Sequence, residues 1–317
     1  MYKYNIKYKN CIKNNKTNII NSFCPIYTNN IENGEFKKEA LKKCASAYIN
    51  LYKWIKEYLI HDGIKIYDIV ERIENKIIAM NEIELVCPVS VTYNNIINFT
   101  PDKSNFSDLI LTKNDVISLD IILCNNSIIL DESAIFSLSD EYNSIINLSV
   151  DNVRKIINNV SINKPIAEVC AVLPTGIRCG YQLLPHGRLM YGKQLFSSSK
   201  NIMEENESYF ICYPIVRNTD CIEKGNNFNV YYKVGGITDS WLYKIIDNNF
   251  DSYFCRRWLD NLGCKKYMIE LNKLFASNII DKVYYMTDKS ESVVTKYGKT
   301  IMVTKDGIDV FVPFDIY

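Results

Sequence analysis

The sequence predicts an α+β chain built on an antiparallel sheet. Two segments with an apolar stripe at helical spacing come first, and Ile-rich segments joined by short polar turns follow them. A second helical block then separates these strands from a last hairpin. Helices and strands that occur in separate runs, rather than in strict alternation, are typical of helices packed on an antiparallel sheet.

The expected elements follow in chain order. Helices are predicted at 37–59 and 66–80, where Leu and Ile residues recur at helical spacing and Asp62-Gly63 separates the two runs. Further elements are strands at 84–92, 117–123, 128–138 and 208–216, a helix at 150–159, and strand-like segments alternating with polar loops over 165–245. A helical pattern over 247–281 and a hairpin turning at Asp306-Gly307 follow. Residues 1–35 have weak periodicity and are expected to form an N-terminal arm before a domain that spans 36–317.

Composition excludes several classes of protein. The 317 residues carry a formal net charge of +1, so no global signal for nucleic acid or an anionic membrane exists. The Lys- and Asn-rich start lacks the apolar segment of a secretory signal, and no apolar run reaches the roughly 18 residues of a membrane span. Eleven cysteines, with no CxxC pair, favour reduced thiols in a cytoplasmic protein over disulfides or a zinc ribbon. Heavy use of Asn, Ile, Lys and Tyr suggests an AT-rich genome.

The stretch SLDIILCNNSIILDE places two carboxylates in an apolar hairpin. A two-residue turn at Asn125-Asn126 would put Asp120 directly opposite Asp131 on one sheet face. Like charges at that position repel, so a buried pair needs a cation, a shared proton or water. A divalent metal is one answer, and an exposed hairpin with solvated carboxylates is the other.

Several segments together resemble type 2 methionine aminopeptidases, members of peptidase family M24. FDSYFCRRWLDNLGCKKY at 250–267 carries the most specific resemblance, NFTPD at 98–102 is similar to the family's HYTPN, and the C-terminal segment is similar to the family's last strands. Asp120 and Asp131 have the spacing of its first two metal ligands. The resemblance runs from about residue 37 to the end and includes a helical type 2 insertion at about 218–290.

The resemblance implies the pita-bread (creatinase/aminopeptidase) fold, a curved antiparallel sheet with helices on its outer face. In that family the concave face holds two divalent metals through two Asp, one His and two Glu side chains. The metals activate a bridging hydroxide that removes an N-terminal Met.

Carried over position by position, the resemblance implies a degenerate metal site. Asp120 and Asp131 are retained, whereas the family's other ligand positions hold different residues: Ile177 for the His, and Cys212 and Gly298 for the two Glu. The pocket His of HYTP falls at Asn98, and His186 lies close to a further pocket His. Isoleucine and glycine side chains cannot ligate a metal, so we expect no bound cofactor; an active form would need Mn, Co or Zn.

Without a metal, the two carboxylates need another source of neutralisation. A proton held by one Asp is one solution, and a basic side chain is another: Lys296, Lys299 or Arg178. Lys296 has the same strand parity as Gly298, so it is the better candidate of the two lysines.

Three functions follow from this site. The first is a catalytically inactive pseudoenzyme that binds a protein partner or a polypeptide N-terminus, since related pita-bread proteins without metals bind proteins or RNA. The composition of this chain gives no support for a nucleic-acid partner, and no membrane partner is expected. The second is an active methionine aminopeptidase with a remodelled one-metal site, which needs at least three strong ligands and an open position for water. Asp120, Asp131 and Cys212, with His186 as a substitute ligand, could hold one Zn²⁺ there. The third is a scaffold whose cleft is filled by its own side chains.

Overall fold

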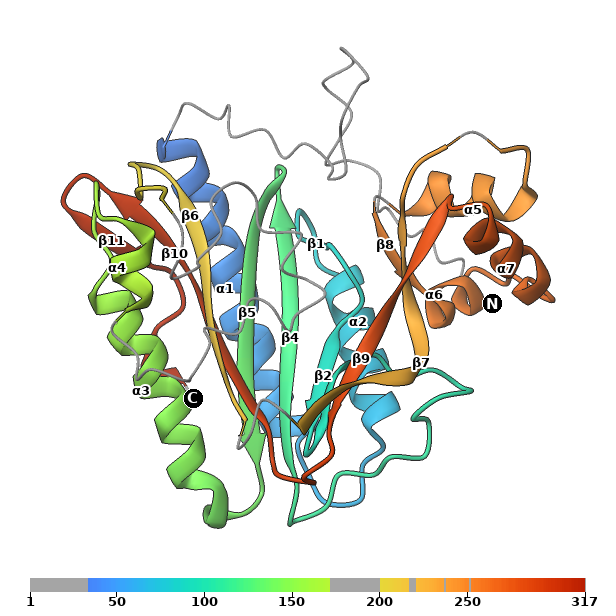
Figure 1. Cartoon of the computed structure of the whole chain (residues 1–317), viewed down its shortest axis with the longest axis horizontal. Coiled ribbons are helices and arrows are strands. Elements are labelled where there is room, and N and C mark those ends of the chain that lie inside the picture. Colours follow the sequence, from blue (N-terminus) through green and yellow to red (C-terminus); the bar gives the residue numbers. More distant parts are fainter. Residues whose placement is uncertain (1–33, 172–199, 217–220, 237, 251, 317) are drawn as a thin grey trace.

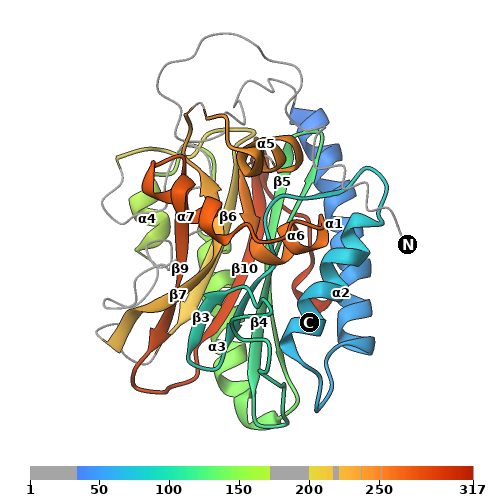
Figure 2. The ribbon, with the colours of Figure 1, turned by 90° about the vertical axis from the view of Figure 1, so that its right-hand side faces the viewer.

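The computed structural model describes residues 34–171, 200–216, 221–236, 238–250 and 252–316. Over these ranges the chain forms one antiparallel sheet of eleven strands with helices packed against it (Figures 1 and 2). The strand order is β11-β10-β5-β4-β2-β3-β9-β7-β8, with β1 beside β4 and β6 beside β10. None of the described helices is long and apolar enough to cross a membrane. Most of the predicted arm, together with Ile177, Arg178 and His186, lies outside the described residues.

The first half of the sheet is covered by the two predicted N-terminal helices. These are α1 (Gly34–Tyr58) and α2 (Ile66–Ile78), and α1 packs on β4 (Val116–Asn125) and β5 (Ile128–Ser137). The apolar stripes found in the sequence are the buried faces of both helices. The strand predicted at 84–92 is divided into β1 (Glu84–Leu85) and β2 (Ser90–Tyr93), with β3 (Ile96–Phe99) following. Pro88 lies between β1 and β2, where its missing N–H leaves no donor for a strand partner.

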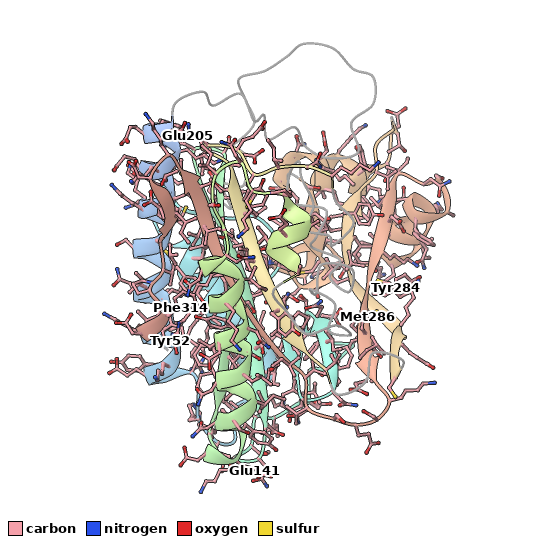
Figure 3. All side chains as sticks on the ribbon, turned by 60° about the vertical axis from the view of Figure 1, so that its left-hand side comes forward. Tyr52, Glu141, Glu205, Tyr284, Met286 and Phe314 are labelled. Atoms are coloured by element: carbon pink, nitrogen blue, oxygen red, sulfur yellow. The ribbon has the colours of Figure 1, made fainter. Side chains whose placement is uncertain are left out.

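The second half of the sheet is covered by α3 (Asn143–Asn158). This helix packs on β6 (Ser208–Ile215) and β10 (Thr295–Thr304), and Figure 3 shows Phe314 beside it and Glu141 at its start. The helix begins seven residues before the predicted start. The prediction missed this part because polar residues lie on the buried face and interrupt the apolar pattern; the Ser149 hydroxyl, for example, lies 2.6 Å from that of Thr295. The remaining elements here are η1 (Asp140–Tyr142), α4 (Ile166–Cys170), β11 (Gly307–Val310) and η5 (Phe314–Ile316).

The segment predicted as a helical insertion is mixed in structure. It contains β7 (Ile222–Lys233), α5 (Trp241–Asn249), β8 (Tyr253–Cys255), α6 (Arg256–Asn261), α7 (Met268–Ala276) and β9 (Ile280–Asp288). β9 pairs with both β3 and β7, so two long strands of the insertion extend the central sheet. The description of 218–290 as helical was wrong for these strands, although β7 lies in the stretch expected to alternate strand-like segments with loops. Each strand contains one Val and two adjacent Tyr, residues that fit a half-buried pleated surface.

Candidate functional site

The candidate site lies on the sheet face opposite α1 and α3. In β4 the residues Leu119, Ile121 and Leu123 belong to the core under the N-terminal helices, so the alternate residues, including Asp120, point to the other face. Gly298 of β10 pairs with Ser133 of β5, and Ser133 pairs with Asp120. Directly paired residues share a face, and these pairings therefore bring β4, β5 and β10 together at one point.

The register of the Asp hairpin differs from the prediction. Asn126 and Ser127 form the turn with φ of 49° and 66°, the positive values that a tight two-residue hairpin turn requires, and Asn125 is the last strand residue. Asn125 stays in the strand because its side-chain amide donates to the Glu82 carbonyl at 2.7 Å. Asp131 therefore pairs with Ile122, and Asp120 and Asp131 are diagonal neighbours on one face. The expectation that they lie directly opposite each other was wrong: the turn lies one residue later than predicted, so Asp120 pairs with Ser133, two residues beyond Asp131.

The last hairpin shows the same kind of shift. Thr304 of β10 pairs with Gly307 of β11, so Lys305 and Asp306 are the turn residues rather than Asp306 and Gly307. The predicted hairpin itself is confirmed.

Lys296 supplies the cation next to the Asp pair. Its ammonium Nζ lies 2.5 Å from Oδ2 of Asp120, and it also donates to Oδ1 of Asn98 at 3.3 Å. The backbone of Lys296 is held in place by two hydrogen bonds: its N–H donates to Ser118 Oγ at 3.0 Å, and its carbonyl accepts from Ser133 Oγ at 3.0 Å. The strand-parity argument for Lys296 is thus confirmed.

The site is buried and incompletely hydrogen-bonded. Asp120 and Asp131 are each 4% exposed and Lys296 is 2% exposed. Oδ1 of Asp120, Oδ1 of Asp131 and Nδ2 of Asn98 are buried without a hydrogen-bond partner among the described residues. Buried polar atoms are nearly always satisfied in folded proteins, so three unsatisfied atoms gathered around one lysine distinguish this part of the core.

The electrostatics of the site follow from burial and from these neighbours. Burial, reinforced by Asp120 and Glu132 and opposed by Lys296, raises the pKa of Asp131 well above its ordinary value. Burial alone would lower the pKa of Lys296, but the attraction of Asp120 outweighs it and the pKa is raised. At neutral pH Lys296 is therefore an ammonium, and Asp131 is driven towards its neutral form.

The two positions that the resemblance assigns to Glu ligands, Cys212 and Gly298, face each other across β6 and β10. Cys212 pairs directly with Gly298, and burial raises the pKa of the Cys212 thiol far above its ordinary value. A Cβ atom built on Gly298 would lie 2.4 Å from the ring of Phe210 and 3.1 Å from Cβ of Cys212. The Phe210 ring therefore fills the space that a larger side chain at position 298 would need.

The second lysine of β10 serves the opposite face. Lys299 Nζ lies 3.0 Å from Oε2 of Glu132, and neither side chain has any exposed surface. Lys299 does not reach the Asp pair, as strand parity predicts. His61, read from the sequence as a surface residue, is exposed.

A second buried ion pair, which the sequence did not reveal, joins α2 to the 250–267 segment that carries the most specific resemblance. Arg257 of α6 lies 2.5 Å from Oε1 of Glu74 on α2, and Trp258 Nε1 donates to Oε2 of Glu74 at 2.7 Å. Arg257 also donates to the carbonyl of Pro101, in the NFTPD segment. A carboxylate at position 74, inside the apolar stripe of the second predicted helix, was the signal that could have pointed to this pair.

The described residues do not fit a dimetal centre. No cluster of three or more His, Cys, Asp or Glu side chains in the described ranges could hold a metal ion. The chemistry agrees, since an ammonium contacts one retained carboxylate and an aromatic ring fills the space beside Gly298. The family positions at Ile177 and His186 are outside these ranges.

The sequence of this chain is similar to those of known methionine aminopeptidases. No protein-family model matches the chain. Methionine aminopeptidase 2-2 of Emericella nidulans is 22% identical over 87% of this chain and 69% of its own length. The methionine aminopeptidase of Methanocaldococcus jannaschii is 24% identical over 80% of this chain and 90% of its own length.

Solved structures agree on the fold. A thermophilic Arx1 is similar with a TM-score of 0.63 at 12% identity, over 88% of this chain and 90% of that chain. The methionine aminopeptidase of Rickettsia prowazekii is similar with a TM-score of 0.55 at 12% identity, over 88% of this chain and 98% of that chain. The sequence relatives and the shared architecture together identify the chain as a homologue of the type 2 methionine aminopeptidases with a pita-bread fold.

Proposed function

We propose that this chain is a methionine aminopeptidase homologue without peptidase activity that works by binding a protein partner. The observation that carries the proposal is the contact between Lys296 and Asp120, 2.5 Å long and fully buried. A lysine ammonium supplies there the positive charge that a metal ion supplies in the relatives. One cation already neutralises Asp120, so the site has no electrostatic need for a second one.

Charge repulsion supports this proposal. A divalent ion placed between Asp120 and Asp131 would lie within a few ångströms of the Lys296 ammonium, in a buried site where charges are poorly screened. Release of a proton from Lys296 would remove the repulsion, but the pKa of Lys296 is raised rather than lowered. Metal binding would therefore have to displace the lysine from its carboxylate.

The loss of bridging ligands supports the proposal independently. Two metals that share a hydroxide, about 3.5–4 Å apart, need carboxylates that bridge them. Cys212 offers only a buried thiol with a raised pKa, and Gly298 offers no side chain. A glutamate at 298 would also have to move Phe210.

The burial of the site bears on where a partner binds. Asn98, Asp120, Asp131, Cys212 and Lys296 are all buried, so little of the former cleft is accessible to a polypeptide N-terminus. Burial of these side chains favours a partner that binds to the outer surface over one whose α-amino group binds to Asp120 and Asp131. A partner protein is thus a better fit than a small peptide.

The proposal is tested by metal content and Met release measured on the same samples. The full chain is loaded with Mn²⁺, Co²⁺ or Zn²⁺, desalted, and assayed for bound metal and for Met released from a Met-Ala-Ser peptide. We expect no stoichiometric metal and no Met. Asp120→Ala serves as the matched control: stoichiometric metal together with Met release that disappears in this variant would establish the active one-metal enzyme instead.

A further inference from the structure

The first turns of α5 and α7 expose large apolar side chains. Ile269 is 73% exposed, Trp241 is 47% exposed, and Met268 is also exposed. Lys265 and Lys266 immediately precede α7 and are exposed as well. These five residues are called the insertion tip below.

The two turns lie side by side. α5 packs on α7. Ser240, the N-cap of α5, is the main cause of a lowered pKa at Glu270, which follows Ile269. Ser240 and Glu270 are therefore in contact, and Trp241 and Ile269 are their neighbours in sequence. Figure 1 shows α5 and α7 at the side of the molecule farthest from α3.

The exposed side chains of the insertion tip do not result from incomplete packing of α5 and α7. The other faces of the same helices bury Leu242, Ile246, Leu271 and Leu274 almost completely. Single exposed apolar residues are common on protein surfaces, but clustered ones mark interaction sites.

The five residues of the insertion tip carry two positive charges, those of Lys265 and Lys266, and no negative charge. Lys244 and Lys273 are balanced by Asp239 at 3.6 Å and by Glu270 at 3.4 Å. Lys265 and Lys266, by contrast, form no ion pair with any described residue. An apolar centre beside uncompensated cations fits a partner surface that has an apolar groove flanked by carboxylates.

A protein fits this surface better than a nucleic acid does. Trp241 can stack on a base, but Ile269, the most exposed apolar side chain of the tip, can neither stack on a base nor hydrogen-bond to one. Two lysines also supply few of the phosphate contacts on which binding of a nucleic acid depends. We propose that the insertion tip is the docking surface for an acidic, partly apolar segment of a partner protein. The inference rests on the proposed function, because it names the surface through which the binding module acts.

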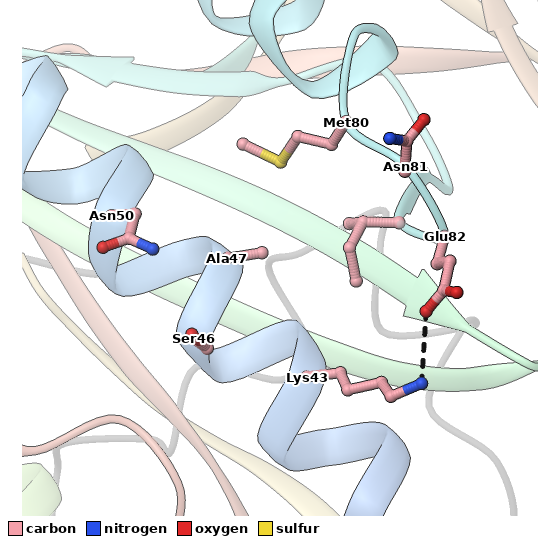
Figure 4. Close-up of a pocket in the computed structure, with 8 residues that line it drawn as sticks. Lys43, Ser46, Ala47, Asn50, Met80, Asn81 and Glu82 are labelled. Atoms are coloured by element: carbon pink, nitrogen blue, oxygen red, sulfur yellow. Dashed lines mark hydrogen bonds and ion pairs between the residues drawn. The ribbon is translucent and has the colours of Figure 1, made fainter.

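A pocket between α1 and the α2–β1 connection is a weaker candidate. It has a volume of about 430 Å³ and is lined by Ser46, Ala47, Asn50 and Met80 among others (Figure 4). Lys43 and Glu82 line it too and pair at 3.1 Å, so they neutralise each other. Neither uncompensated charge nor clustered exposed apolar side chains point to an occupant there.

A displayed library of random 16-residue peptides, panned against the full chain, tests the proposal. We expect selected peptides to carry Asp or Glu around an apolar centre. Their affinity should fall at least tenfold in Ile269→Asp and in Lys265→Glu/Lys266→Glu, and it should weaken with added salt. Tyr58→Asp, at another exposed aromatic residue on α1, is the matched control and should leave affinity unchanged.

Three results would overturn the proposal: no peptide enriched over the Ile269→Asp protein, selected peptides that ignore the insertion-tip substitutions, or a mixed-sequence single-stranded RNA that binds at the tip in place of peptide. Unchanged unfolding midpoints of the variants show that they are folded. Met release by the chain would end the proposed function while leaving peptide binding at the tip intact, so the two failures are distinguishable.

Discussion

Two buried ion pairs of equal length differ in this molecule in how their carboxylates are hydrogen-bonded, although Nε of Arg257 also has no partner among the described residues. Glu74–Arg257 and Asp120–Lys296 each have a closest contact of 2.5 Å. Both oxygens of Glu74 are satisfied, by Arg257, by the Val89 N–H at 3.0 Å and by the Trp258 indole. At the other pair, Oδ1 of Asp120 has no hydrogen-bond partner in the described part of the chain.

The difference separates a pair that joins several segments from a pair that leaves its carboxylate partly unsatisfied. The carboxylate of Glu74 holds α2, α6 and the strand connection at Val89 in one arrangement, and Arg257 adds a contact to Pro101. A guanidinium supports such a junction because its several donors point in fixed directions. Lys296 supplies a single point charge to carboxylates whose spacing matches a metal site, and unsatisfied atoms remain around it.

Glu74→Ala should break the structural pair and cause the largest effect. The substitution leaves Arg257 charged, 1% exposed and without its carboxylate, and it also removes the acceptors of Val89 and Trp258. Loss of one partner of a buried pair costs about 3–5 kcal/mol, to be measured as the free energy of unfolding in urea. A loss below about 1 kcal/mol would contradict the structural role.

The control for Glu74→Ala is an exposed ion pair. Lys42 and Glu39 lie 2.8 Å apart on the surface of α1. Glu39→Ala should change the free energy of unfolding by less than about 0.5 kcal/mol, because exposed pairs are screened by water.

Lys296→Met should weaken the fold less than Glu74→Ala does. The substitution leaves Asp120 and Asp131 without a cation, but two carboxylates on one face can share a proton, and that relieves part of the repulsion. We expect a loss of about 2–3 kcal/mol at pH 7.

A double-mutant cycle isolates the contact between Lys296 and Asp120. Asp120→Asn/Lys296→Met removes both charges, so it should recover more than about 1 kcal/mol relative to the lysine substitution alone. Strict additivity of the two single changes would mean that the 2.5 Å contact carries no coupling energy. Lys305→Met in the exposed hairpin turn is the matched control and should be nearly neutral.

The two ion pairs also show what the sequence could predict. Strand parity selected Lys296 over Lys299, since alternation along β10 is a local rule that holds wherever the strand is regular. Local rules also placed α1 and α2 and assigned both Asp residues to one face. The relation between Glu74 and Arg257 spans 183 residues, and no periodicity connects side chains so far apart.

The pairing register of the Asp hairpin was predicted less well than the helices and the strand faces. Two adjacent asparagines made Asn125-Asn126 a plausible turn, but the amide of Asn125 is used by the Glu82 carbonyl, a partner on another segment. Mixed structure in the insertion was missed for a similar reason. β7 and β9 become strands by pairing with each other and with β3, which is a tertiary effect.

Asp131→Asn should stabilise the protein and sharpen the comparison. Burial first, and then Asp120 and Glu132, raises the pKa of Asp131, so the folded state keeps a proton that the unfolded chain releases above about pH 4. The folded state binds more protons in this range, and its stability therefore falls as pH rises from the unfolded pKa towards the raised folded pKa. An asparagine stays neutral throughout and does not have this dependence.

The measurement is the free energy of unfolding of both proteins between pH 4 and pH 8. Asp131→Asn should be more stable than the native chain at pH 7, by on the order of 1 kcal/mol, and the advantage should shrink towards pH 4, where both side chains are neutral. Asp306→Asn, in the exposed turn, should show no such trend. An advantage that does not depend on pH would mean that Asp131 is already ionised in the fold, and that the Lys296 ammonium neutralises both carboxylates rather than Asp120 alone.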